Sequence, residues 1–166
     1  MGLMASWVAV KGASRDEVLA AMGFELASPE AWVEPGCAVA DYSVHELSTG
    51  WTVLFAEDFD WADRARVIEA SKLGEAVGLQ FEDKVQMTCV AVGARDGVEV
   101  WRVHHDNDGE PLAETGVPPD AYQAIRDRLV IEQLADDSVD YLHEIGHDLG
   151  EAVCGYRVDT YAPLFQ

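Results

Sequence analysis

Basic residues are scarce in this chain. Its 166 residues contain 11 Lys and Arg against 31 Asp and Glu, which gives a formal net charge of −20 at pH 7. A chain so poor in cations does not neutralise phosphate groups, which excludes nucleic-acid binding of the electrostatic kind. The same charge disfavours docking on anionic membranes. A surface of this charge keeps a folded domain soluble and attracts basic proteins.

Long apolar runs are also lacking, and cysteine is rare. No apolar run reaches the ~18 residues of a membrane span, and the first residues show no basic segment followed by an apolar one, so we expect no secretory signal. The three cysteines, Cys37, Cys89 and Cys154, are odd in number and widely spaced. This spacing argues against a disulfide framework and is typical of a reducing compartment. We therefore expect a cytoplasmic protein.

What the chain does contain is the composition of one folded domain. Hydrophobic residues make up 49% of the sequence, and the length is typical of a single domain, here residues 1–166. Strand-like runs cover 5–12, 50–56, 77–81, 85–93 and 98–105, and the turn at 94–97 joins the last two as a hairpin. The pattern predicts an α+β domain with a mostly antiparallel sheet of five or six strands and about four helices.

Capping residues indicate where these helices begin and end. Ser14 and Glu17 form a capping box before the first helix. A second helix is predicted over 61–73, with Asp60 as its cap and Gly74 at its end. The third is expected over 119–134, and the fourth over 139–153 with Gly155 at its end.

The fourth helix carries the sharpest motif of the chain, His143-Glu144-Ile145-Gly146-His147. Residues four apart share one face of a helix, so both imidazoles can reach one Zn²⁺ while Glu144 acts as general base on the metal-bound water. The motif resembles the first part of the signature of the metzincin peptidases. That resemblance stops at Val153, which stands at the third ligand position and cannot bind a metal.

A third ligand has to come from elsewhere in the chain. Asp159 follows the helix in a way that resembles the aspzincin peptidases, and Glu151 lies one turn further along the helix. The zinc-hydrolase hypothesis therefore takes His143, His147 and Asp159 as ligands, with Glu144 as the catalytic base.

An ordinary amphipathic helix explains the same residues. At 100° per residue, an apolar stripe forms that can pack on a sheet, and the two histidines fall on its flank. The residues of that stripe are Leu142, Ile145, Leu149, Ala152 and Val153. On this interpretation the motif is a coincidence and no metal is bound.

Further segments favour the interpretation without a metal. The chain resembles a family of uncharacterised bacterial proteins in the segments SWVAVKG (6–12), EVL (17–19), GWTVLF (50–55), EVWRVHHD (99–106), GVPP (116–119), VDYL (139–142) and GYR (155–157). The resemblance carries over no activity, cofactor or site. It implies that other residues usually stand at positions 143 and 147.

Two other polar groups have simple structural explanations. His104 and His105 are consecutive strand residues, so they point to opposite faces and are expected as strand-end polar residues. The acidic segment 106–110 begins like a calcium loop, but position 115 is Thr where such a loop needs Glu, which indicates a turn.

Two functions follow from the sequence. We favour an acidic, non-catalytic module that binds a protein partner, in one form a neutralising or immunity-type partner of a basic protein, without a cofactor. The alternative is a Zn²⁺-dependent, metallopeptidase-like hydrolase that uses the motif at 143–147.

Overall fold

A computed structural model describes residues 3–24, 42–107 and 112–158. Seven strands form one antiparallel sheet in the order β2-β3-β1-β4-β5-β6-β7. The strands are β1 (Met4–Lys11), β2 (Tyr42–Glu46), β3 (Trp51–Ala56), β4 (Glu75–Glu82), β5 (Thr88–Arg95), β6 (Val98–His105) and β7 (Ala113–Gly116). The helices are α1 (Arg15–Ala21), α2 (Arg64–Ala70), α3 (Tyr122–Ala135) and α4 (Ile145–Cys154), and η1 (Ser71–Leu73) and η2 (Leu142–Glu144) are 3-10 turns.

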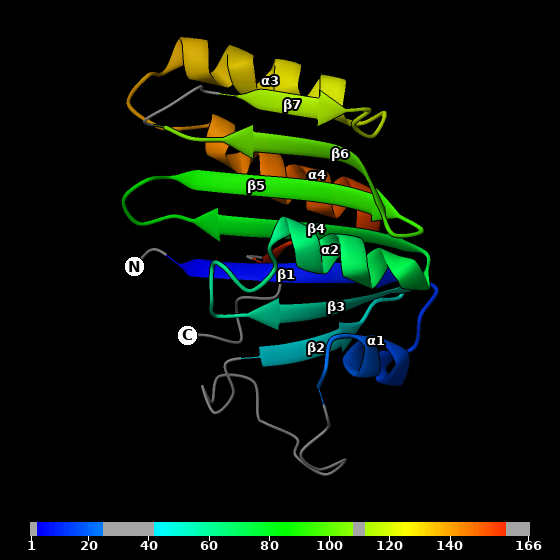
Figure 1. The fold of residues 1–166 in the computed structure, drawn as a ribbon. Coiled ribbons are helices and arrows are strands. Elements are labelled where there is room, and N and C mark those ends of the chain that lie inside the picture. Colours follow the sequence, from blue (N-terminus) through cyan, green and yellow to red (C-terminus); the bar gives the residue numbers. More distant parts are fainter. Residues whose placement is uncertain (1–2, 25–41, 108–111, 159–166) are drawn as a thin grey trace.

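The helices cover both faces of the sheet. Figure 1 shows α1 and α2 on one face and α4 on the other, with α3 lying beside the β7 edge. Each face has its own core. Val8, Leu54 and Val67 are buried on the α1/α2 side, and Trp7, Leu79 and Leu149 on the α4 side. Alternate residues of the central strand β1 serve the two cores in turn, which is why this strand is apolar along most of its length.

The predicted α+β domain is confirmed in the described residues, but the predicted number of strands was too low. The strands that the sequence did not reveal are β2 and β7, which lie at the two edges of the sheet. Edge strands are half exposed and short, so their side chains carry little of the apolar pattern that marks a buried strand.

Several local predictions are confirmed. Ser14 and Glu17 form the capping box of α1. The hairpin turns at Asp96 and Gly97. Both residues have positive φ, as a two-residue primed turn requires. Gly155 ends α4 in the left-handed conformation.

Three helix starts were predicted too early. The third helix, expected from 119, begins at Tyr122. The second helix begins at Arg64 after the cap Asp63, not after Asp60, because the Asp63 carboxylate accepts a hydrogen bond from the Arg66 amide. The fourth element opens as the 3-10 turn η2, and α4 begins only at Ile145.

The described cysteines are core residues. Cys89 and Cys154 are buried and free, and burial raises the pKa of both thiols to about 12, so both stay protonated at neutral pH. Cys37 lies outside the described residues. In the part of the chain that the structure describes, no helix has the length and hydrophobicity to cross a membrane.

Candidate metal site

The two histidines of the motif lie at the junction of η2 and α4. His143 is in η2 and His147 in α4, and their ring centroids are 6.0 Å apart. Their exposed fractions are only 3% and 8%. The sequence placed both rings on the flank of an amphipathic helix, and the structure buries that flank.

Glycines explain how these histidines come to be buried. A Cβ atom at Gly146 would lie 2.4 Å from Leu79 Cδ1 of β4, and one at Gly150 would lie 2.6 Å from Trp7 Cζ2 of β1. Only glycine allows so close an approach of a helix to a sheet. The backbone of α4 therefore lies directly on the central strands, and side chains beside this contact are covered by the sheet.

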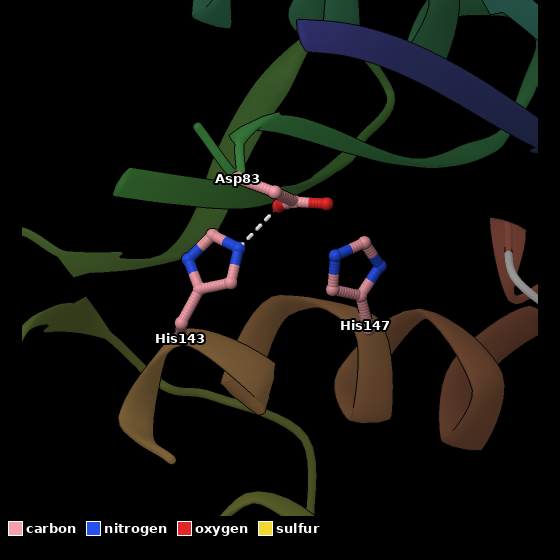
Figure 2. Close-up of side chains that lie close together, drawn as sticks. All are labelled: Asp83, His143 and His147. Atoms are coloured by element: carbon pink, nitrogen blue, oxygen red, sulfur yellow. Dashed lines mark hydrogen bonds and ion pairs between the residues drawn. The ribbon is translucent and has the colours of Figure 1, made fainter. Parts of the chain in front are cut away.

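A carboxylate from a distant part of the sequence completes a group of three. Asp83 follows β4 and accepts a hydrogen bond from Nε2 of His143. Figure 2 shows the Asp83 carboxylate facing both imidazole rings. One ligand atom from each of Asp83, His143 and His147 lies within 4.8 Å of the other two. Ligand atoms on one tetrahedral zinc are about 3.4 Å apart. Small side-chain rotations that move these three ligand atoms by about 1 Å would therefore let all of them bind one zinc ion.

Among the described residues, Asp83 is the carboxylate that the structure brings to the two histidines. Glu151, one candidate from the sequence, is turned toward Arg157, with Oε2 3.8 Å from Nη1 of the guanidinium group. Asp159, the ligand of the sequence hypothesis, lies outside the described residues, so its role stays a prediction.

The imidazole of His147 lacks the partners that a buried polar ring normally has. Within the described residues its nitrogens make no hydrogen bond or ion pair, and the ring packs edge-on against Phe81 with centroids 4.7 Å apart. Burial lowers the pKa of His147, so the ring is neutral at pH 7. A neutral, buried imidazole with free nitrogens is the form that binds a metal ion.

His143 has a different electrostatic environment. Burial opposes its charge, but the hydrogen bond and charge of Asp83, together with Glu144, outweigh burial and raise the pKa of His143. Its Nδ1 is buried without a hydrogen bond of regular geometry, although the Met87 backbone is near enough to favour the charged ring. This environment therefore favours a positive charge at His143.

Glu144, the base of the sequence hypothesis, is held in an ion pair. Its carboxylate accepts from Nη2 of Arg157, while Nη1 of the same arginine binds Asp148. Glu144 is nevertheless close enough for its charge to act on both His143 and His147. For Glu144 to take a proton from a metal-bound water, this ion pair has to open.

A second histidine–carboxylate pair lies next to the first and holds the backbone of His143. Nε2 of His105 lies 2.7 Å from Oδ2 of Asp140, and Oδ1 of Asp140 accepts from the backbone N–H of His143 at 3.3 Å. His105 is the last residue of β6, as predicted, but it is 2% exposed and paired with Asp140. Asp140 fixes the start of η2 and with it the backbone of His143.

Nothing in the local sequence marks Asp83 or Asp140 as site residues. Asp83 stands 60 positions before His143, in a short turn before β5, which begins at Thr88 and not at 85 as the sequence predicts. The one usable signal was that the motif needs a third ligand, and only the pairing of β4 with β5 places the turn above α4.

No family model, curated protein or solved structure matches the chain. The candidate site is therefore argued from its geometry alone. The resemblance to a bacterial family therefore stays a prediction.

Proposed function

We propose that this protein binds a divalent transition metal, Zn²⁺ in the first place, through Asp83, His143 and His147. One observation carries the proposal: ligand atoms from the β4–β5 turn, η2 and α4 converge within 4.8 Å. Two imidazoles and one carboxylate are a donor set that zinc accepts. The ring of His147 is 8% exposed, and its nitrogens have no hydrogen bond within the described residues, so they are available to the metal.

Three protein ligands leave one position of a tetrahedral zinc open to water, which is the arrangement of catalytic zinc sites. The side chain of Asp83 is 34% exposed, so solvent can reach the site through this residue. Zinc lowers the pKa of a bound water to about 7 and supplies a nucleophile at neutral pH. We therefore propose hydrolysis as the reaction class, with Glu144 as the base once it leaves Arg157.

Metal content is the test. Protein purified without chelator is analysed for zinc beside Asp83→Asn and His147→Ala, with His104→Ala as the control histidine outside the site. We expect about one zinc per chain in the wild type and in the control. Because each ligand bond is lost outright, affinity in the two site variants should fall by more than the 10–100-fold typical of outer-shell changes. A wild type that binds no zinc would overturn the proposal.

Two further variants decide the identity of the third ligand. Asp159→Asn and Glu151→Gln remove the candidates expected from the sequence. The structure favours Asp83, so zinc affinity should be unchanged in both variants. A loss in Asp159→Asn with normal binding in Asp83→Asn would return the sequence hypothesis in place of ours.

Protein binding is a second candidate, favoured by exposed apolar side chains on α3. Ile131 and Leu134 are 67% and 82% exposed, on a molecule with a net charge of −20. We propose that a basic cytoplasmic protein docks here. Immobilised protein should retain such a partner at low salt, and Leu134→Asp should release it. Equal retention by both proteins would count against this surface.

A further inference from the structure

The turn that delivers Asp83 is organised around a single carboxylate. The chain leaves β4 at Glu82 and enters β5 at Thr88. The carboxylate of Glu82 accepts backbone hydrogen bonds from Lys84 at 2.7 Å, Val85 at 2.9 Å and Gln86 at 2.7 Å. Three successive amides thus point at one side chain, which fixes the course of the turn.

Both oxygens of the Glu82 carboxylate are used by these backbone donors. The residue is 6% exposed, Oε1 accepts from Lys84 and Val85, and Oε2 accepts from Gln86. A glutamine at position 82 could replace it only in part, because its amide nitrogen would face a backbone N–H in place of one accepting oxygen.

Asp83 is fixed on both sides as a result. Its own N–H donates to the Leu3 carbonyl at 2.9 Å, just before β1. The three residues after it are held by Glu82. The turn closes at Met87, whose φ of 49° is one of the two positive values among described residues other than glycine. The carboxylate of Asp83 is therefore presented to α4 by a backbone with little freedom.

We propose that Glu82 is a positioning residue of the metal site, which holds the β4–β5 turn so that Asp83 reaches the metal with His143 and His147. This inference rests on the proposed metal binding. Metal ligands are placed by partners that do not themselves touch the metal, and removal of such a partner typically costs 10–100-fold in affinity.

The test compares the two ends of β4. Glu82→Gln keeps the size of the side chain and removes its charge. The matched control is Glu75→Gln, since Glu75 begins the same strand and makes an ion pair with Arg95 at 3.3 Å. We expect the zinc dissociation constant to rise about 10–100-fold in Glu82→Gln and to stay unchanged in Glu75→Gln. The visible spectrum of bound Co²⁺, which reports ligand geometry, should change only in Glu82→Gln.

A double variant separates positioning from general loss of structure. If Glu82 acts through Asp83, Asp83→Asn and the Glu82→Gln/Asp83→Asn protein bind Zn²⁺ equally weakly. Further weakening in the double variant would overturn the inference. If Glu82→Gln does not fold, as judged by circular dichroism, Glu82→Asp takes its place, and wild-type affinity in that variant would also overturn it.

The two proposals fail in different ways. A wild type without zinc removes the proposed function and this inference with it. A wild type that binds zinc, beside a Glu82→Gln protein that binds equally well with the same Co²⁺ spectrum, removes only the role of Glu82.

Discussion

Among the described residues, buried hydroxyls lie on the α1/α2 face of the sheet and three buried imidazoles lie on the α4 face, while the buried carboxylate of Glu82 belongs to the β4–β5 turn. Thr52 donates to the Ala13 carbonyl at 2.9 Å, and Ser71 donates to the Ile68 carbonyl at 2.7 Å. Each hydroxyl is satisfied by nearby backbone and needs nothing more. His105, His143 and His147 lie on the other face. The side chains of His105 and His143 contact the carboxylates of Asp140 and Asp83.

The two kinds of buried side chain differ in what they can bind. A buried hydroxyl bonded to a carbonyl stabilises a turn or helix end and can do little else. A neutral imidazole whose nitrogens make no hydrogen bond within the protein keeps them available to a ligand. The candidate site therefore lies on the α4 face of the sheet.

The largest expected effect is on the packing of α4. Leu149 is fully buried, and Leu149→Ala should lower the free energy of unfolding by about 2–5 kcal/mol because the cavity collapses only in part. Val67→Ala, on the α2 side, deletes fewer atoms and should cost less. Urea unfolding measures both, and zinc titration should show weaker binding only in Leu149→Ala. Equal zinc binding in both variants would show that the packing of the α4 face does not affect the site more than that of the α2 face.

A smaller effect concerns pH and His147. Its pKa in the folded protein lies below the ordinary value near 6.5, so the unfolded chain binds more protons below that pH. Stability is lost as the pH falls from 6.5 through the folded pKa. With EDTA present, the urea midpoint of the wild type should therefore drop more between pH 7 and pH 5 than that of His147→Gln. An equal drop in both proteins would show that His147 titrates normally.

The smallest expected effect belongs to the α1 side. The Ser14 side chain accepts from the Glu17 amide at 3.3 Å, and Ser14→Ala should cost about 1 kcal/mol as a lost N-cap. Zinc affinity should not change, since α1 lies on the opposite face. Thermal unfolding and zinc titration check the two parts, and weaker zinc binding would show that the two faces are coupled.

How much of this could be read from the sequence depends on the range of the interactions. The capping box at Ser14 and the turn at Gly97 are local, so their residue types alone predict them. His143 and His147 are four residues apart, and their pairing also follows from the chain itself. Asp83 was out of reach, because its place depends on strand pairing between β4 and β5. Glu82 was missed as well, since a carboxylate that holds a turn looks the same in sequence as one on the surface.

The span between Asp83 and His143 gives the site a consequence for folding. A metal ion held by both residues closes a chain segment of 60 residues, just as a disulfide bond would. Such a cross-link stabilises mainly by reducing the conformational entropy of the unfolded chain, and the gain grows slowly with the length of the closed loop. In a chain whose two described cysteines are buried and unpaired, a bound metal would be the cross-link that joins the β4–β5 turn to η2 and α4.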